Sequence, residues 1–345
     1  MTPMDETEKT LRAAHPLDDA SDPSRGHEHA QDKHVHADER SHGHSHGAAA
    51  EAGADEGRPR IAFVGAGRVG TALGVAFARA GWDVTAVASR SEERRQRFRE
   101  LVPGARGFAD GQGVLDEAEL IFLTVPDDAI AAAAAELHLY SGQALVHTSG
   151  ALPANVLAPA MAAGTSVGSF HPLVSFIDTD QALRDLHGAT IALDGDDSLL
   201  PLLADLAEQI GAQPVLLPEG GKAAYHAAAM LAAGGLVGLM DGIASVARLA
   251  GLDEKTAVAV YAPLARQALA NAERLGIDES LSGPFVRGDV GTVRSHLAVL
   301  RELAPGALPL YVAVARRELD IGRRRGELTG AAAAELEQLL ADAAR

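Results

Sequence analysis

The chain of 345 residues contains no cysteine. It therefore has no disulfide bond, thiolate nucleophile or sulfur-ligated metal, which is typical of a reducing compartment, and we expect a cytoplasmic protein. Basic residues are also scarce: 30 Lys and Arg stand against 47 Asp and Glu, a formal net charge of −17. Because binding to nucleic-acid phosphates needs a basic face, this balance argues against a nucleic-acid partner.

Residues 1–58 have very few large apolar side chains and no apolar run of the kind that a signal peptide needs. They hold thirteen acidic residues, six basic residues and eight of the fourteen histidines. Such a segment cannot bury enough surface to offset its ordering entropy, so we interpret it as a disordered tail. Its alternating His42, His44 and His46 suit adventitious metal chelation, or are simply solvated. We expect no catalytic metal.

Long runs of strongly hydrophobic residues are also lacking. Residues 223–240 approach the length of a membrane span and contain no Asp, Glu, Lys or Arg. This stretch is mostly alanine and glycine and includes His226, so we expect a buried helix and no membrane partner. Its small residues allow close helix packing, and we expect the helical part of the chain to form a homodimer.

A glycine-rich turn between an apolar run and a helical pattern is the most informative feature that is present. The turn follows residues 61–64 and a second strand pattern follows at residues 83–88. Its first glycine permits a tight turn, its second lets the backbone approach a pyrophosphate, and its third lets the helix pack closely. This order predicts a dinucleotide site, with a plain strand-turn-helix as the alternative. The predicted cofactor-binding residues of the turn are Gly65, Gly67, Arg68, Val69 and Gly70.

The end of the second strand indicates which dinucleotide binds. NAD sites usually place a carboxylate there for the ribose 2′-hydroxyl, whereas this strand runs into Ser89, Arg90 and Ser91. Hydroxyls and a guanidinium suit a 2′-phosphate, so we expect NADP. Ser91 also suits the cap of the next helix, and the two roles are compatible.

Short apolar runs alternate with helical patterns up to about residue 217, and five helical patterns follow. This order predicts an α/β fold with a Rossmann-type, doubly wound parallel sheet and an all-helical C-terminal domain. We divide the chain into the tail, residues 1–58, an NADP-binding Rossmann domain, residues 59–186, and a mainly helical domain for substrate and dimerisation, residues 187–345. The helices are expected near residues 222–249, 253–274, 290–303, 308–323 and 330–344.

Ligands of such sheets bind outside the carboxyl ends of the strands, and several candidate residues lie at strand ends. Val125 and Pro126 end one strand and are expected at the cofactor. Ser149 and Gly150 follow the next strand, where a hydroxyl and an amide suit a substrate carboxylate. His171, held extended by the proline after it, is a catalytic candidate.

Lys222 opens the long helix, where the helix dipole disfavours a cation, and this unusual position favours a functional role. His226 lies one turn further on the same face. An ammonium facing a bound carbonyl orients it and protonates the developing alkoxide, so we expect Lys222 and His226 to be catalytic. Arg287 suits a bidentate grip on a carboxylate, while Asp289 either caps the next helix or pairs with Arg287.

Six separated motifs together resemble the Rossmann-like proteins that carry the domain of unknown function 2520, over about residues 60–330. The motifs are Gly65 to Gly74, Val125-Pro126-Asp127, His147-Thr148-Ser149-Gly150, His171-Pro172-Leu173, Lys222 to Ala229, and Gly283-Pro284 with Arg287-Gly288-Asp289. The resemblance implies an oxidoreductase whose C-terminal part is similar to 6-phosphogluconate dehydrogenase. Relatives are ketopantoate reductase, pyrroline-5-carboxylate reductase and prephenate dehydrogenase.

The wider superfamily uses a lysine on the long helix of its second domain, which corresponds to Lys222. An asparagine that often follows is replaced here by the run at residues 232–235. We expect an NADPH-dependent reductase of a small carboxylate-bearing carbonyl compound, such as a ketopantoate-like 2-keto acid. The alternatives are a cyclic imine reductase of the pyrroline-carboxylate type and a non-catalytic NADP-binding or metal-handling protein.

Overall fold

The computed structural model describes residues 57–161 and 164–345. Residues 1–56 of the predicted tail, with the candidate metal-chelating histidines at positions 42, 44 and 46, lie outside the described residues. Of the tail, the structure describes residues 57 and 58, where the Arg58 guanidinium lies over the Trp82 ring, 4.7 Å from its centre.

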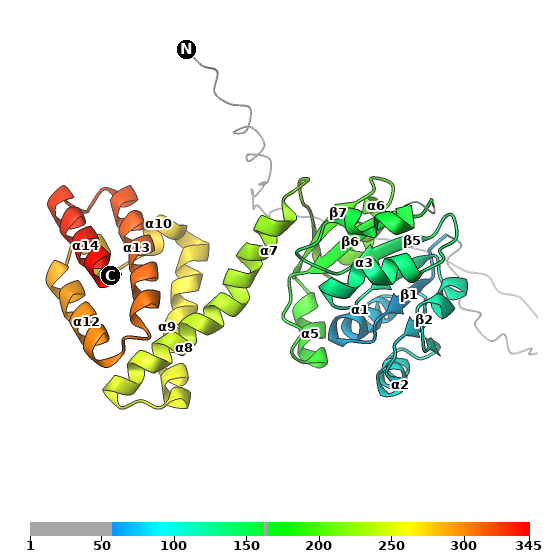
Figure 1. The fold of residues 1–345 in the computed structure, drawn as a ribbon, viewed down its shortest axis with the longest axis horizontal. Helices are drawn as coiled ribbons and strands as arrows, with labels where there is room; N and C mark the ends of the chain where they lie inside the picture. The colour runs from blue at the N-terminus through cyan, green and yellow to red at the C-terminus, as the bar shows by residue number, and fades with distance from the viewer. Residues whose placement is uncertain (1–56, 162–163) are drawn as a thin grey trace, which may run out of the picture. The chain divides into compact units, whose positions relative to one another are not determined.

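Eight strands form one sheet in the order β3-β2-β1-β4-β5-β6-β7-β8 (Figure 1). All neighbouring strands are parallel except β6 and β7, which are antiparallel. The expected Rossmann-type sheet is confirmed, but it is mostly rather than wholly parallel, a common variation at the edge of such sheets. Strands β7 and β8 continue the sheet past residue 186, where we placed the end of the Rossmann domain. The strands are β1 Ile61–Val64, β2 Val84–Ala88, β3 Arg106–Phe108, β4 Leu120–Leu123, β5 Ala144–His147, β6 Ser166–Pro172, β7 Thr190–Gly195 and β8 Gln213–Leu216.

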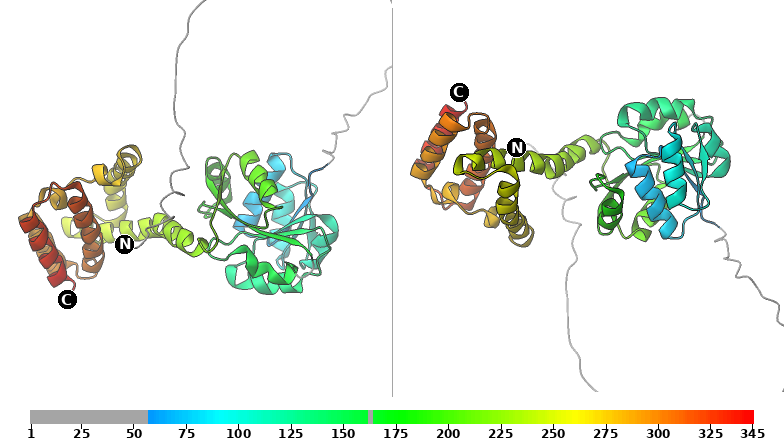
Figure 2. Two further views of the ribbon diagram at one scale, coloured as in Figure 1. Left: turned by 90° about the horizontal axis from the view of Figure 1, so that it is seen from above. Right: turned by 90° about the horizontal axis from the view of Figure 1, so that it is seen from below.

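Helices cover both faces of the sheet, as Figures 1 and 2 show. One face packs against α1 Arg68–Arg79, α2 Glu92–Leu101, α5 Thr179–Leu186 and α6 Leu200–Gln209. The other packs against η3 Gln112–Glu117, α3 Asp127–Glu136, η4 Ala154–Leu157 and α4 Ala158–Met161. Four phenylalanines, Phe63, Phe77, Phe122 and Phe170, stack or meet edge to face beneath α1 and fix that helix on the sheet.

The C-terminal half is helical, as expected. One long helix consists of α7 Lys222–Met230, a π-helical turn Leu231–Gly235, α8 Leu236–Ala247 and a 3-10 turn Arg248–Ala250. It is followed by α9 Glu254–Leu275, α10 Ile277–Ser280, α11 Pro284–Arg287, α12 Val290–Leu303, α13 Leu308–Arg325 and α14 Gly330–Ala343. Helices α11 to α14 enclose their own core, which includes Phe285, Val293, Leu319 and Leu336.

The expected burial of the stretch at residues 223–240 is wrong. Of the helices in the described part of the chain, only the one at Lys222–Ala250 is long and apolar enough to cross a membrane, with a mean hydropathy of 1.6, and just 6% of that apolar window is buried. The physical reason is that few side chains pack against this helix. The small core that it shares with α9 consists of Ala257 of α9 and of Ala244 and Ala247, near the C-terminal end of α8. The sequence pattern predicts an apolar helix but not what covers it.

Candidate functional site

The glycine turn after β1 closes against the end of β4. Gly65 has φ +118°, and a Cβ built on it would lie 2.6 Å from the Thr124 carbonyl oxygen. A Cβ on Gly70 would lie 2.3 Å from the Gly65 carbonyl oxygen, so only glycine fits at both positions. The Thr124 hydroxyl donates to the same Gly65 oxygen at 2.6 Å. Sequence analysis missed Thr124, since its contact depends on β1 and β4 being neighbours.

The turn has the features that a dinucleotide pyrophosphate needs. A Cβ on Gly67 would meet only one atom within 4 Å, at 3.9 Å, so the fold itself does not require glycine there. Gly67 precedes α1, whose first turn has no side-chain cap and no acidic residue. The first amides of α1 are thus available to an anion, at the point where the strand order reverses between β1 and β4. The residues present fit the cofactor's phosphates.

The end of β2 presents one uncommitted guanidinium. Ser91 accepts a hydrogen bond from the Arg94 amide at 3.3 Å and so caps α2, the alternative role we had left open. Arg95 donates to the Ser89 carbonyl oxygen and to Glu92. Arg90 is exposed and has no side-chain partner among residues 57–161 and 164–345. It is therefore free to pair with an added phosphate, while Arg95 is held by the protein.

Lys222 is 4% exposed at the start of α7. Its Nζ donates to the Ser149 carbonyl oxygen at 3.0 Å and to the Ser169 hydroxyl. Burial lowers the pKa of this ammonium to about 8, partly opposed by the charges of Asp194 and Asp127. An ammonium with a pKa near neutrality, fixed by two acceptors, is suited to proton transfer.

Ser149 connects this lysine to the end of β4. Its hydroxyl donates to an Asp127 carboxylate oxygen at 2.7 Å and accepts from the amides of residues 151 and 152. Its own amide donates to Nδ1 of His147 at 3.1 Å, whose Nε2 is 3.2 Å from the Pro153 carbonyl oxygen. Burial, followed by the Lys222 charge, lowers the pKa of His147 to about 4, so this imidazole stays neutral and holds the loop in place.

Three aromatic side chains and one glycine converge beside Lys222. The ring of His171 lies 5.7 Å from Tyr225 and 5.8 Å from His226, centre to centre. A Cβ on Gly150 would come within 2.6 Å of Nε2 of His171 and 2.5 Å of Nδ1 of His226. Burial and the Lys222 charge also lower the pKa of His171 to about 4.

Several buried polar atoms in this group have no hydrogen-bond partner among the described residues. Nδ1 of His171, Nδ1 of His226 and the Tyr225 hydroxyl are buried and make no hydrogen bond to any described residue. Because an unpaired buried polar atom costs about 1–3 kcal/mol, three of them in one cluster indicate a place for a ligand's polar groups.

The structure brings together Lys222, His226, His171, Ser149 and Gly150. Arg287, which we expected at the substrate, has an exposed side chain that pairs with Asp289 at 2.8 Å. The Asp289 side chain does not cap α12, so pairing, the other role considered, is the observed one. Val125 and Pro126 connect β4 to α3, beside the glycine turn.

A cavity of about 660 Å³ is lined by Lys222, residues of η4 and β7, and the residues before α7. Leucines at positions 193, 200, 216 and 217 form its apolar part. Its wall also carries the acidic side chains of Asp194, Asp196, Asp197 and Glu219. Within the described ranges no group of three His, Asp or Glu side chains is arranged to hold a metal.

Sequence analysis missed Asp127, His147 and Tyr225 as site residues, although each stands inside a motif that we quoted. Ser169 carried no signal at all, because it reaches Lys222 only through the pairing of β6 with β5, which places it opposite His147.

Comparison with protein families matches residues 46–172 to a Rossmann-like domain and residues 189–318 to the domain of unknown function DUF2520. A search of the curated proteins gives no match.

Solved structures give the same picture of the fold. Protein TM1727 from Thermotoga maritima is 26% identical, with a TM-score of 0.62 over 77% of this chain and 99% of its own. BF3122 from Bacteroides fragilis, which carries a provisional assignment as an NADP oxidoreductase, is 21% identical, with a TM-score of 0.61 over 76% of this chain and 98% of its own. A reductive aminase from Aspergillus terreus, solved with NADPH and ethyl-5-oxohexanoate, is 16% identical, with a TM-score of 0.54 over 84% and 94%. The chain is therefore a Rossmann-like domain followed by a DUF2520 domain, as its motifs predict.

Proposed function

We propose that the protein is an NADPH-dependent reductase of a small carboxylate-bearing carbonyl compound. The observation that carries the proposal is Lys222, a buried ammonium with a pKa of about 8 at the carboxyl edge of a sheet whose glycine turn fits a dinucleotide. The assignment of the Bacteroides fragilis protein and the NADPH in the Aspergillus terreus structure support the cofactor.

The chain's residues would hold two groups of the cofactor, its pyrophosphate and its 2′-phosphate. The first amides of α1, after Gly67, would bind the pyrophosphate, and Arg90 would pair with the 2′-phosphate. When bound, NADPH supplies a hydride. Everything else in the reaction falls to the protein: it binds and orients the carbonyl compound, excludes water and delivers a proton.

Lys222 would deliver that proton from Nζ to the carbonyl oxygen as charge develops there. Ser149 and Ser169 fix the direction of its N–H bonds and would keep the ammonium in place after substrate binds. The unpaired Tyr225 hydroxyl and the imidazoles of His171 and His226 would donate hydrogen bonds to the substrate carboxylate.

A second candidate, reduction of an imine, is favoured by a different observation. The cavity beside Lys222 carries four carboxylates, which suit a cationic iminium or amine better than a carboxylate. The likeness to a reductive aminase is in line with this candidate.

One assay separates the two candidates. The full chain is incubated with NADPH and a panel of 2-keto acids, then with the same acids plus ammonia or a primary amine, and with cyclic imines. Oxidation of NADPH by keto acids alone supports the carbonyl reductase, and oxidation only with amine or imine supports the second candidate. NADPH binding without turnover on any member would favour a non-catalytic nucleotide-binding protein.

A further inference from the structure

We infer that Asp127 is a positioning residue for Lys222, acting through Ser149, and that the Ser149 hydroxyl does not bind substrate. The catalytic consequence rests on the proposed function, because that function makes Lys222 the proton donor. The structural part, that Asp127 holds Lys222 in place and charged, does not depend on it. Asp127 is the first residue of α3, which begins just after β4.

The Ser149 hydroxyl uses its full hydrogen-bonding capacity within the chain. Its hydrogen is donated to a carboxylate oxygen of Asp127 at 2.7 Å. Its oxygen accepts from the amides of Ala151 at 3.2 Å and Leu152 at 3.1 Å. Because a hydroxyl has one donor and two acceptor positions, none is left for another group. Ser149 therefore has no free hydrogen for the substrate carboxylate that we expected it to bind.

The same bonds fix the carbonyl group that holds Lys222. The Ser149 hydroxyl is held by Asp127, and the Ser149 amide donates to Nδ1 of His147 at 3.1 Å. With both groups of one residue fixed, its carbonyl oxygen has a single direction. That oxygen accepts from Nζ of Lys222 at 3.0 Å. Asp127 thus anchors on α3 a loop that would otherwise set the position of the ammonium alone.

Helix α3 is a rigid support for this carboxylate. Its first turn contains Asp127 and Asp128, where the helix dipole favours negative charge. Ile130 and Ala134 of the same helix are buried in the core on that face of the sheet. Asp128 is exposed, and its side chain bonds to no residue that the structure describes. Of the two acidic residues in this turn, only Asp127 is connected to the site.

Titratable groups face Lys222 from several elements. Two carboxylates, Asp194 of β7 and Asp127 of α3, oppose the lowering of its pKa by burial. His147 of β5 and His171 of β6 stay neutral, because burial and the Lys222 charge lower the pKa of each to about 4. The other titratable groups nearby are Tyr225 and His226 on α7 itself, and Asp196, Asp197 and Glu219 in the wall of the adjoining cavity.

The two carboxylates differ in what they contact. Among the described residues, the Asp194 side chain accepts only from the Ala154 amide, at 2.7 Å. Asp194 therefore acts on Lys222 by charge alone. Asp127 acts by charge and also by its hydrogen bond to the residue that holds Lys222. Only Asp127 can couple the position of the ammonium to its protonation.

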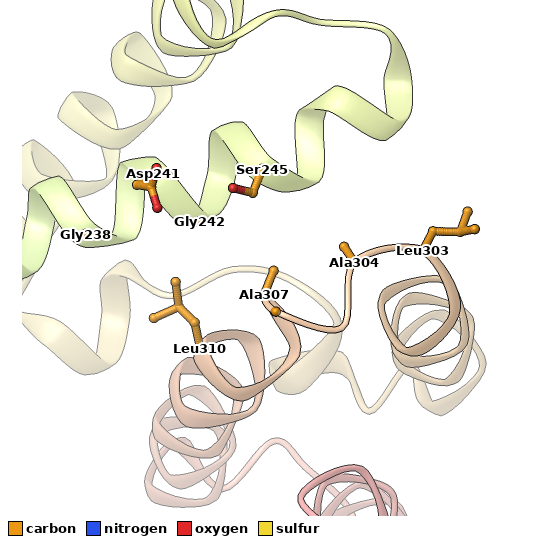
Figure 3. A pocket seen from close by; sticks show the side chains of 9 residues that line it. Gly238, Asp241, Gly242, Ser245, Leu303, Ala304, Ala307 and Leu310 are labelled. Atoms are coloured by element: carbon orange, nitrogen blue, oxygen red, sulfur yellow. The ribbon is translucent and has the colours of Figure 1, made fainter.

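A third carboxylate, on the long helix itself, provides a reference for charge at a distance. Asp241 lines a separate cavity of about 420 Å³, together with Ser245 of the same helix and Leu310 of α13 (Figure 3). It follows Lys222 by 19 residues, roughly 28 Å along a helix. Asp241→Asn therefore changes the net charge as Asp127→Asn does, far from the site.

NMR of the lysine side chains tests the structural part without cofactor or substrate. The full chain has four lysines, at positions 9, 33, 222 and 255, so ¹³C labelling at Cε gives four signals, and Lys222→Met identifies the signal of Lys222. Asp127→Asn removes the charge but keeps an acceptor oxygen for Ser149. It should lower the pKa of Lys222, because the ammonium loses a stabilising charge, and leave its side chain ordered. The matched controls Asp128→Asn and Asp241→Asn should change neither property.

Asp127→Ala removes the acceptor as well as the charge. We expect it to lower the pKa of Lys222 and also to lower the order parameter at Cε, since the Ser149 loop is released. Ser149→Ala, which keeps the carbonyl group and the Asp127 charge, should lower the order parameter in the same way.

Single-turnover hydride transfer, on the substrate that the panel identifies, tests the catalytic part. At pH 6 the ammonium is charged in each variant, so only its position differs. Asp127→Asn should then keep nearly the wild-type rate, with its alkaline limb moved to lower pH, whereas Asp127→Ala should be about tenfold slower or more.

The outcomes separate this inference from the proposed function. If both Asp127 variants leave the pKa and the order parameter of Lys222 unchanged, or if Asp128→Asn changes them equally, the positioning role is overturned, whatever the enzyme reduces. If the panel yields no substrate, the proposed function fails, and the NMR titrations still decide whether Asp127 holds Lys222.

Discussion

At the scale of single residues, the cofactor preference depends on a guanidinium that the protein leaves unpaired. Arg90 is exposed at the end of β2, whereas Arg95 is held by Ser89 and Glu92. We expect wild-type protein to bind NADPH at least tenfold more tightly than NADH, about 1.4 kcal/mol. Arg90→Ala should remove most of this preference while leaving NADH affinity nearly unchanged, because only the 2′-phosphate distinguishes the cofactors.

Dissociation constants from fluorescence titration with both cofactors check this prediction. Arg97→Ala, on the exposed side of α2, is the matched control and should keep the preference. Equal affinities of the wild-type protein for NADPH and NADH would contradict it.

The sequence singles out a candidate residue where that residue stands out locally, and it misses one whose contacts depend on strand pairing. Lys222 was found because a lysine is out of place in a first helical turn, and the structure buries it beside Ser149. Ser169 and Thr124 were missed because nothing in their own neighbourhood distinguishes them. Each acquires its contact only from the sheet order, which brings β6 beside β5 and β4 beside β1.

At the scale of elements, two glycines at the junction of the turn and α1 have different roles. Gly70 is needed for folding, and Gly67 is expected to serve cofactor binding. Gly70→Ala would place a Cβ 2.3 Å from the Gly65 carbonyl oxygen, which is backbone and cannot yield cheaply. We therefore expect Gly70→Ala to lower the free energy of unfolding by about 2 kcal/mol or more, in the range of overpacked positions.

Gly67→Ala is its matched partner, because the nearest atom to its Cβ would be 3.9 Å away. We expect this variant to unfold at the wild-type denaturant concentration but to bind NADPH at least tenfold more weakly, since the methyl group occupies the space of the pyrophosphate. Urea unfolding curves and NADPH titrations of both variants check the pair. Wild-type NADPH affinity in a folded Gly67→Ala protein would remove the cofactor from this turn.

The long helix shows that sequence periodicity predicts a helix but not whether that helix is buried. Composition and pattern predicted a helix at residues 222–249, close to the observed one, but we expected it to be buried. Burial depends on what lies opposite, and α9 covers only the region of Ala244 and Ala247. Arg287 pairs with Asp289, one of the two roles the sequence left open for Asp289, and its contact with a substrate stays a prediction.

At the scale of the whole molecule, the neutral imidazoles of His147 and His171 make the free energy of unfolding depend on pH. Burial lowers the pKa of His147 and of His171 to about 4, against 6.5 in the unfolded chain. Between these values the unfolded state binds more protons than the folded state, so stability falls as pH drops from 6.5 toward 4. Each histidine should contribute about 2 kcal/mol of this loss between pH 7 and pH 5.

Urea unfolding at pH 7 and pH 5 measures this loss directly. His147→Asn should reduce the difference between the two pH values, because asparagine does not titrate. His138→Asn, at an exposed histidine, should leave the difference unchanged. A wild-type stability that is equal at the two pH values would contradict the neutral, buried state of these imidazoles.

The fold as a whole was largely predictable, because alternating apolar runs and helices admit few arrangements of a parallel sheet. Its edge was not. Strands β7 and β8 lie beyond the boundary we placed at residue 186, and β7 runs antiparallel to β6. The apolar runs up to about residue 217 are the sequence signal of both strands, but the direction of β7 has no such signal, since it depends on the path of the connection through α5.

The central claim is that Lys222 protonates a carbonyl oxygen as hydride arrives. The most direct test is the rate of single-turnover hydride transfer from NADPH to the keto acid that the substrate panel identifies. The wild-type rate should fall above a pKa of about 8, as the ammonium is lost. Lys222→Met should transfer hydride about a hundredfold more slowly, without this alkaline limb and with NADPH affinity retained. Lys255→Met, at an exposed lysine, should behave as wild type. A Lys222→Met protein that transfers hydride at the wild-type rate, with the same pH profile, would contradict the account.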